Sequence, residues 1–422
     1  MARPRLSPDA PEAPGLPARR AALRLLDAVL RRGLPLEAAL AGATGDLERR
    51  EDRGLAHAIA AAVLRRLPDL DALIDGATQR PLPDDAKARF VLRIALAQAL
   101  VLGTPPHAAI ATALPLVDGG PRKLVHGVFG TLMRGNARLP DAATLPADTD
   151  ARWSAAWGEE MVIAAALAIA QQPLLDLSLR GDAGPDGVAL AERHRRLRDA
   201  GPIATLPGYD AGEWWVQDLA ASIPARLLGN GPGHAIDLCA APGGKTLQLA
   251  AAGWTVTALD SSESRLARLS ENLARTQLSA DVITGDALVW KPAAPADAVL
   301  LDAPCSATGI FRRHPDVLHR VRPSIIAETV ALQTRLLNRA AEWVKPGGRL
   351  VYATCSLELA EGEAQLDRFL AARSDYAIEP ATAAELPDGV AAHDRGYVRT
   401  LPGMLADAGG LDGFFIVRLR RS

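Results

Sequence analysis

Residues 234–260 read HAIDLCAAPGGKTLQLAAAGWTVTALD, and the fold prediction starts from this stretch. An apolar run of strand length at 234–240 leads into a turn rich in Gly and Pro. A helical pattern follows at 245–253, and a second apolar run ends at Asp260. A strand, a tight turn, a helix and another strand form the βαβ unit of a parallel sheet. The small residues of the turn allow a ligand to approach the backbone at the helix N-terminus.

The same alternation continues to the end of the chain. The apolar spacing predicts helices at 264–276 and 328–344, and strands at 281–286, 297–302, 348–355 and 413–419. Together these segments indicate an α/β fold with a doubly wound parallel sheet. In such sheets, ligands bind beyond the carboxyl ends of the strands.

The first part of the chain has a different pattern, because its apolar spacing is helical from about 19 to 135. RRAALRLLDAVLRRG (19–33), for example, places Leu23, Leu26, Val29 and Leu30 on one face of a helix. We therefore predict an all-helical domain over residues 1–140. Two interpretations of the arginines at 19, 20, 31 and 32 stay open: an RNA-facing patch, or solvated side chains on exposed helix faces.

Residues 136–150 (NARLPDAATLPADTD) are rich in Pro and lack periodicity, which is typical of a linker. The segment after it is expected to contain a strand at 174–182, a helix at 189–201 and another helix at 212–229. The resulting domain prediction is 1–140, all-helical; 141–230, a linker with a small mixed α/β subdomain; and 231–422, the doubly wound domain.

Composition excludes several classes of protein. With 49% hydrophobic and 23% charged residues, the chain can bury a globular core. Its three cysteines include no CxxC pair, which argues against a disulfide framework and a zinc site, so we expect no metal and a reducing cytoplasmic location. MARPRLSPDAPEAPGLPARR (1–20) lacks the apolar core of a secretory signal and is expected to be a flexible lead. The apolar run at 161–170 is half the length that a membrane span needs, so no membrane association is expected.

The net charge of −2 is unevenly distributed. Residues 1–140 contain 20 Lys and Arg against 14 Asp and Glu, whereas the remainder contains 27 against 35. A basic N-terminal region joined to an acidic C-terminal region favours binding of an anionic partner such as nucleic acid. Solvation of charged surface residues alone also produces such an imbalance.

The turn after the first strand ends in GGKT, which raises the possibility of a nucleotide-phosphate loop. A P-loop needs glycine at position 239, where this chain has Cys239. Acidic residues instead end four predicted strands: Asp237, Asp260, Asp286 and Asp302. A carboxylate at the end of the second strand can accept both hydroxyls of a ribose. The pattern favours an adenosyl ligand over a dinucleotide.

Two of the three cysteines, Cys305 and Cys355, each follow an apolar strand, in LLDAPCSATGIFRRHPD (300–316) and YATCS (352–356). A free cysteine is most often a small buried hydrophobe. These two segments, together with DLCAAPGGKT (237–246), VQDLAAS (216–222) and DGFF (412–415), resemble the motifs of RNA cytosine-5 methyltransferases over roughly 200 residues. The helical front resembles the antitermination factor NusB.

The resemblance implies a Rossmann-like catalytic domain that uses S-adenosyl-L-methionine. Cys355 would be the nucleophile that adds to carbon 6 of cytosine, Cys305 would act in the later release step, and Asp302 would hold and protonate the pyrimidine edge. Cofactor contacts are expected from Cys239, Ala240, Ala241, Pro242, Gly243, Gly244, Lys245, Asp260, Asp286 and Asp302. After Thr-Cys-Ser the family usually continues with Pro-Glu-Glu-Asn, whereas this chain has LELAEGE and retains Glu361 as a matching acid.

A reactive thiolate needs an electropositive setting, for which Lys245, Arg312 and Arg313 are candidates. Arg312, Arg313 and His314 are the expected RNA contacts, although His314 could equally cap a turn. Because the target base has to leave any stack, single-stranded or loop RNA is the expected substrate. The combination with a NusB-like domain favours small-subunit 16S rRNA, and we expect a monomer.

Two alternatives remain at this point. One is an enzyme with the same machinery that modifies tRNA or 23S rRNA. The other is a non-enzymatic RNA-binding factor in ribosome assembly, which the retention of both strand-end cysteines disfavours.

Overall fold

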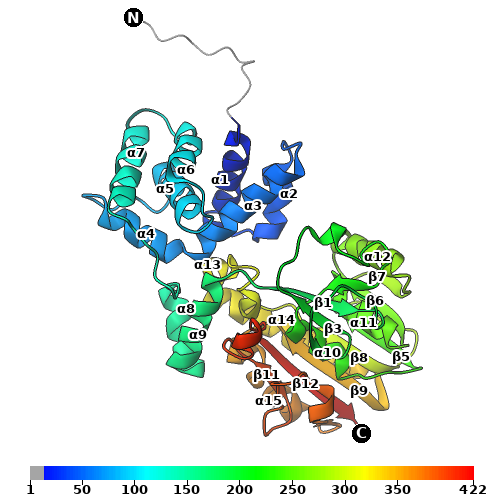
Figure 1. Cartoon of the computed structure of the whole chain (residues 1–422). Helices are drawn as coiled ribbons and strands as arrows, with labels where there is room; N and C mark the ends of the chain where they lie inside the picture. Colours follow the sequence, from blue (N-terminus) through cyan, green and yellow to red (C-terminus); the bar gives the residue numbers. More distant parts are fainter. Residues whose placement is uncertain (1–13) are drawn as a thin grey trace, which may run out of the picture. The chain divides into compact units, whose positions relative to one another are not determined.

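The computed structural model describes residues 14–422, which fall into two compact units (Figure 1). The helical unit comprises the described residues up to Asp150 together with His314–Arg320. The sheet unit comprises Ala151–Arg313 and Val321–Ser422. The first thirteen residues of the predicted flexible lead lie outside the described residues.

The helical unit is built from helices, as the apolar spacing predicts. Its helices are α1 (Leu16–Leu30), α2 (Leu36–Thr44), α3 (Arg50–Arg65), α4 (Leu67–Gly76), α5 (Lys87–Leu100), α6 (Pro106–Ala113), α7 (Gly119–Arg134) and α13 (Val317–Arg320), with a 3-10 turn at Leu114–Leu116. The apolar faces of α1, α3 and α5 form the core, in which Leu25, Ile59 and Leu92 are fully buried. Burial of these faces, more than helix propensity, stabilises helices of this length.

Two predictions at the start of the chain need correction. The last residues of the predicted flexible lead are helical, because α1 begins at Leu16 with a proline in its first turn, where the missing N–H costs no hydrogen bond. Arg19 is also buried, and its Nε donates to Gln98 Oε1 at 2.8 Å. It therefore cannot belong to a surface patch with Arg31 and Arg32, which are about half exposed.

The segment His314–Arg320 completes the helical unit from far along the chain. Its short helix α13 packs against α1, and the backbone N–H of Leu36 donates to Asp316 Oδ2 at 3.2 Å. The His319 ring is hydrogen-bonded to the carbonyl of Leu64 at 2.7 Å. Burial lowers the pKa of His319 below its ordinary value, against the opposing effect of that hydrogen bond. This histidine is thus a partly buried, neutral hydrogen-bonding group.

The sheet unit contains the predicted α/β fold. Its large sheet has the strand order β10-β12-β9-β8-β5-β6-β7, with β11 paired to β12. The strands are β5 (His234–Leu238), β6 (Thr255–Asp260), β7 (Asp281–Thr284), β8 (Ala296–Asp302), β9 (Val344–Thr354), β10 (Tyr376–Ile378), β11 (Val398–Thr400) and β12 (Phe414–Arg421). Strands β5 to β9 are mutually parallel, whereas β12 runs antiparallel to β9.

The remaining helices are α8 (Ala147–Trp157), α9 (Glu159–Ala170), α10 (Leu219–Arg226), α11 (Gly244–Ala251), α12 (Glu263–Thr276), α14 (Pro323–Glu342) and α15 (Glu363–Ala372). Of these, α11, α12, α14 and α15 connect strands of the large sheet, whereas α8, α9 and α10 come before it in the chain (Figure 1). The division between the units falls within the first turn of α8. Short 3-10 turns occur at Ile203–Thr205, Thr308–Ile310, Leu359–Glu361, Ala383–Glu385 and Ala406–Ala408.

The central position of β8 decides where functional side chains meet. This strand pairs with β5 on one side and with β9 on the other, and Asp302 at its end lies opposite Ala353. Because parallel strands end at the same edge, the loops after β8 and β9 are neighbours. Cys305 and Cys355 lie on these two loops.

A second, four-stranded antiparallel sheet has the order β2-β3-β1-β4 and corrects two helix predictions. Its strands are β1 (Leu175–Leu179), β2 (Val188–Ala191), β3 (His194–Leu197) and β4 (Trp214–Val216). The predicted helix at 189–201 is wrong, since β2 and β3 form a hairpin there. Residues 212–229 begin with β4 and become helical only at Leu219, where Asp218 caps α10 through the N–H of Ala220.

Candidate active site

The two strand-end cysteines are brought together at the carboxyl edge of the large sheet. Their sulfur atoms are 3.5 Å apart, and both thiols are free and partly exposed. The pKa of Cys305 is raised well above its ordinary value, first by its hydrogen bond with Cys355 and then by burial. A thiol in this setting keeps its proton, and either sulfur can be the donor of the hydrogen bond between them.

A glycine allows the two cysteine loops to approach so closely. Gly309 N–H donates to the carbonyl of Cys355 at 2.9 Å, and Gly413 N–H donates to the carbonyl of Gly309 at 2.9 Å. A Cβ on Gly309 would lie 1.9 Å from the Gly413 carbonyl oxygen, which no side chain could tolerate. The TGI segment of the predicted motif therefore serves as a point of contact between three chain segments.

Asp302, at the end of β8, forms an ion pair with Lys245 from the turn after β5. The distance from Lys245 Nζ to Asp302 Oδ2 is 2.7 Å. Burial lowers the pKa of Lys245, but Asp302 more than offsets this effect, so the net shift of the pKa is upward and the ammonium stays charged. Lys245 and Arg313 both interact electrostatically with Cys355. Two of the three cations proposed to favour a thiolate at Cys355 are therefore placed to do so.

The predicted cofactor turn, Cys239–Lys245, runs from the end of β5 into α11. Ala240 N–H donates to the carbonyl of Leu259 at 3.1 Å, and Ala240 and Ala241 are buried, whereas Pro242 is exposed. Gly243 has a φ of 111°, and a Cβ there would lie 2.2 Å from Leu269 Cδ1. Only glycine fits this position.

The other strand-end acids differ in their surroundings. Asp260 is buried and accepts hydrogen bonds from Ala241 N–H at 3.1 Å and Ser262 N–H at 2.9 Å. Asp286 is exposed and accepts from Leu288 N–H at 2.8 Å. Each carboxylate oxygen of Asp260 keeps a lone pair free for a further donor.

Two buried groups at the end of β5 have strongly shifted pKa values. Burial raises the pKa of Asp237 to about 7, although the hydroxyl of Thr246 donates to Oδ2 at 2.6 Å and opposes the shift. Asp237 Oδ1 is buried with no hydrogen-bond partner among the described residues. Burial also raises the pKa of Cys239, which therefore remains a thiol.

The three predicted RNA contacts do not share one environment. Arg312 is buried, and its Nη2 donates to the carbonyl of Gly409 at 2.5 Å. Arg313 forms ion pairs with Asp412 and Asp218. Burial raises the pKa of Asp412 to about 7, against the effect of Arg313. His314 belongs to the helical unit.

The sequence analysis missed the polar residues that support both cysteine loops. Ser306 and Ser356 directly follow the two cysteines, and both side chains hydrogen-bond to the buried carboxylate of Glu361. Arg399 Nη1 donates to the carbonyl of Ser356 at 2.6 Å. The repeated Cys-Ser pair was the available signal for the two serines.

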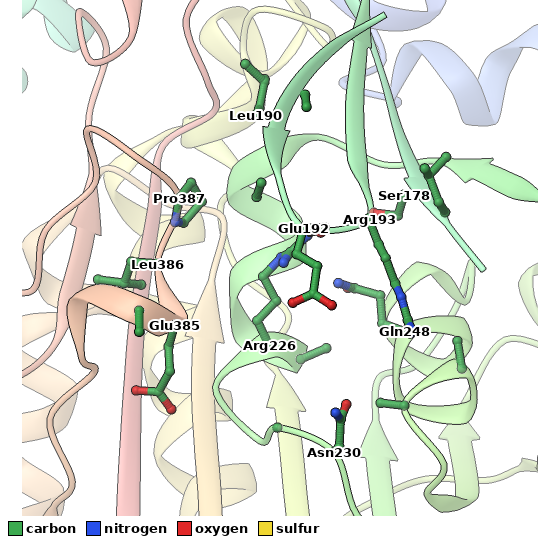
Figure 2. A pocket seen from close by; sticks show the side chains of 18 of the residues that line it. Ser178, Leu190, Glu192, Arg193, Arg226, Asn230, Gln248, Glu385, Leu386 and Pro387 are labelled. Carbon is green, nitrogen blue, oxygen red and sulfur yellow. Dashed lines mark hydrogen bonds between the residues drawn. The ribbon is translucent and has the colours of Figure 1, made fainter. Parts of the chain in front are cut away.

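A cavity of about 660 Å³ lies away from the cysteine pair (Figure 2). Its lining comes from β1, β2 and the turn after it, β4, α10, α11 and residues 384–388, and it contains none of the predicted site residues. The guanidinium of Arg226 donates there to the carbonyl of Glu192. Volume alone therefore does not identify the reactive edge of the sheet.

Two further observations concern the described residues 14–422. Within them, no group of three His, Cys, Asp or Glu side chains is arranged to hold a metal ion. None of the helices in this part of the chain combines the length and apolar character needed to cross a bilayer.

Solved structures share this fold. A methyltransferase homolog protein from Pyrococcus horikoshii has a TM-score of 0.54 and 26% identity, with coverage of 69% of this chain and 98% of that protein. The protein PH0851 has a TM-score of 0.73 and 22% identity, with coverage of 97% and 100%, which supports the fold alone.

Family comparisons assign the two parts of the chain. Residues 16–132 match the NusB family, and residues 228–420 match the family described as 16S rRNA methyltransferase RsmB/F. A ribosomal RNA small subunit methyltransferase B from Xylella fastidiosa strain Temecula1 is 38% identical, covering 96% of this chain and 98% of that protein. The protein of the same name from Pseudomonas syringae pv. tomato is 33% identical, with coverage of 95% and 96%. The chain is thus an RNA methyltransferase that belongs to the RsmB/F family, with a NusB-family domain in front of the methyltransferase domain.

Proposed function

We propose that the chain transfers a methyl group from S-adenosylmethionine to carbon 5 of a cytosine in 16S rRNA. The observation that carries this proposal is the pair of sulfur atoms, 3.5 Å apart, on the loops after β8 and β9. The Lys245–Asp302 ion pair at the neighbouring strand ends supports it. The names of the relatives favour small-subunit rRNA over tRNA or 23S rRNA.

The residues around the β5 turn fit the proposed cofactor. Asp260 has oxygen lone pairs for the ribose hydroxyls, Asp286 is exposed at the next strand end, and Asp237 has one buried oxygen without a partner among the described residues. The turn Cys239–Gly244 would hold the rest of the ligand against the backbone. S-adenosylmethionine, when bound, supplies an electrophilic methyl group.

Cys355 begins the chemistry because carbon 5 of cytosine is a weak nucleophile. The thiolate sulfur forms a bond to carbon 6, and the electrons of the C5–C6 double bond make carbon 5 nucleophilic. The Asp302 carboxylate holds the pyrimidine edge, takes up the proton that the Cys355 thiol releases, and gives that proton to the ring as this adduct forms. Lys245, bonded to the same carboxyl group, stabilises the carboxylate that remains.

Cys305 acts after carbon 5 has gained the methyl group. Cys305, after it has released its own proton to solvent, accepts the remaining C5 proton, and the electron pair of the C5–H bond returns to the ring. The C5–C6 double bond forms again as the bond from carbon 6 to sulfur breaks. Cys355 leaves as a thiolate, and the enzyme is ready for another cycle.

Bisulfite sequencing tests the proposal. Three strains are compared: one that lacks the gene, and the same strain complemented with either the wild-type or the Cys355→Ala gene. Their total RNA is sequenced at every cytosine of 16S rRNA, 23S rRNA and tRNA. We expect a 16S rRNA cytosine whose protection is lost in the deletion strain and restored only by the wild-type gene. Protection lost instead in tRNA or 23S rRNA would contradict the substrate assignment.

A further inference from the structure

Glu361 joins the two cysteine loops through a single buried carboxylate. It ends the 3-10 turn after β9 and has no exposed surface. Its oxygens accept the backbone N–H of Ser306 at 2.9 and 3.2 Å, the hydroxyl of Ser306, and the hydroxyl of Ser356 at 2.5 Å. Two donors come from α14: Thr329 Oγ1 at 2.6 Å and Gln333 Nε2 at 3.0 Å.

The two serines give this carboxylate its relevance to the chemistry. Ser306 directly follows Cys305, and Ser356 directly follows Cys355. One carboxylate therefore fixes the backbone beside both thiols and anchors it to α14. We propose that Glu361 is a positioning residue that sets the separation of Cys305 and Cys355, a role that rests on the proposed function for its catalytic meaning.

The charge of Glu361 acts on the Cys305 thiol. Cys305 interacts with Cys355, with Tyr352 and with the backbone of Ala307, which lowers its pKa, whereas the Glu361 carboxylate adds to the upward shift. Its negative charge thus helps Cys305 to keep its proton. A residue with only a packing role would not have this effect.

Glu361→Gln is a specific test because the glutamine side chain has nearly the same size and shape as the glutamate side chain. A carboxylate has four lone-pair sites for donors, whereas an amide has two and places an NH₂ group against donors already present. In this site, the amide would face the N–H of Ser306 or the NH₂ of Gln333. The substitution removes both the connection between the loops and the negative charge beside Cys305.

The matched control is Glu379→Gln in the same unit. Glu379 follows β10 and accepts from Arg349 at 2.7 and 3.0 Å, so its substitution also removes a charge from an ion-paired site. It is not bonded to either cysteine loop. Loss of general stability should affect both variants, whereas loss of the cysteine arrangement should affect Glu361→Gln alone.

The experiment measures the rate of alkylation of each thiol by iodoacetamide from about pH 6 to 10, with peptide mass spectrometry and no RNA present. In Glu361→Gln, we expect the pH profile of Cys305 to move to lower pH. Below its midpoint, alkylation becomes about tenfold faster for each pH unit by which the profile moves. Turnover on 16S rRNA should fall on the order of 100-fold at an unchanged KM, as misplacement of reacting groups produces. Glu379→Gln should match the wild type in both measurements.

Wild-type alkylation profiles for both thiols in a folded Glu361→Gln protein would overturn the proposal. If that variant does not fold, the double variant Ser306→Ala/Ser356→Ala replaces it, since this pair removes only the hydroxyl contacts from the cysteine loops. Unchanged relative reactivity of the two thiols in the double variant would overturn the proposal equally. The alkylation result does not depend on methyl transfer, whereas failure of the proposed function would leave the wild type inactive on 16S rRNA.

Discussion

Cys305 and Cys355 place their sulfur atoms 3.5 Å apart, so the pKa of Cys305 depends on its neighbour. In the free protein, the pKa of Cys305 is raised first by the hydrogen bond with Cys355, and the charge of Cys355 adds to the shift. A Cys355 sulfur bonded to carbon 6 would have no negative charge, so both effects would end. We infer that Cys305 becomes able to lose its proton only after the adduct forms, which orders the two steps in time.

The first prediction concerns the nucleophile. Cys355→Ala should abolish methyl transfer, because the neighbouring thiol, Cys305, has a raised pKa and keeps its proton, while the melting temperature and the affinity for S-adenosylmethionine stay close to those of the wild type. Incorporation of labelled methyl groups into 16S rRNA measures the effect. Wild-type turnover by the variant would remove Cys355 from the mechanism.

The second prediction separates the roles of the two cysteines. Cys305→Ala should form the covalent adduct and release it slowly, because the assigned role of Cys305 follows methylation. A protein band shifted by bound RNA on a denaturing gel is the expected result. The same band from Cys355→Ala, with none from Cys305→Ala, would show that the roles are exchanged.

The third prediction tests the cofactor assignment of Asp260. Asp260→Ala should weaken S-adenosylmethionine binding about tenfold or more, since hydrogen bonds to a charged group each contribute about 1.5 to 3 kcal/mol. Part of this loss would come from Ala241 N–H, which also loses its acceptor. Calorimetric titration decides the question, with Asp281→Ala at the amino end of β7 as the control. Equal affinities for the two variants would contradict the assignment.

The fourth prediction is a pH dependence of stability that comes from Asp237. Its pKa of about 7 in the folded protein lies above the ordinary value of 3.8, so the folded protein retains a proton that the unfolded chain releases. The stability that this proton provides is complete below pH 3.8 and is lost as the pH rises through about 7.

Asp237→Asn cannot ionise and should remove this decline. Relative to the wild type, its free energy of unfolding should improve between about pH 4 and pH 7, on the order of 1 kcal/mol per pH unit, and the difference should level off above that range. Urea denaturation at several pH values measures the difference, and the similar contribution of Asp412 cancels because both proteins contain it. Parallel curves would show that Asp237 does not titrate in this range.

The fifth prediction addresses the basic helical unit. Arg31 and Arg32 are about half exposed and are paired only with surface acids, so they remain candidates for phosphate contacts. The double variant Arg31→Ala/Arg32→Ala should reduce the log-log slope of RNA affinity against salt by about 1.4, at about 0.7 per phosphate on single strands. Arg395→Ala/Arg420→Ala in the sheet unit, with similar exposure and acidic partners, is the control. Identical slopes for both variants and the wild type would exclude these two contacts.

The parts of the fold that follow local patterns could be predicted from the sequence. Strands β6 and β8 are apolar runs that end on Asp260 and Asp302, and β5 is an apolar run with Asp237 one residue before its end. The helices of the N-terminal domain followed from apolar spacing in the same way. Each of these signals lies within a single segment of the chain.

Features that depend on distant partners could not be predicted. The segment at 189–201 looks helical because it is rich in charge, yet Arg196 lies in a strand, buried against Asp176, which accepts from its guanidinium at 2.5 and 2.7 Å. Arg19 is buried for the same kind of reason, through Gln98. The contacts of Glu361 come from three segments of the chain, and no local sequence pattern predicts that these segments lie together.

The position of α13 in the sequence, far from the rest of the helical unit, has a consequence for chimeric and recombined genes. Val317 and Leu318 are buried, and they are encoded in the middle of the gene's methyltransferase half. A chimera that exchanges only the first 150 residues would pair a foreign α1 with the resident α13. Recombination at that boundary would separate an α1 and an α13 that come from the same protein, even where both parent proteins fold well. We therefore expect functional chimeras to need residues 314–320 from the parent that supplies the helical part.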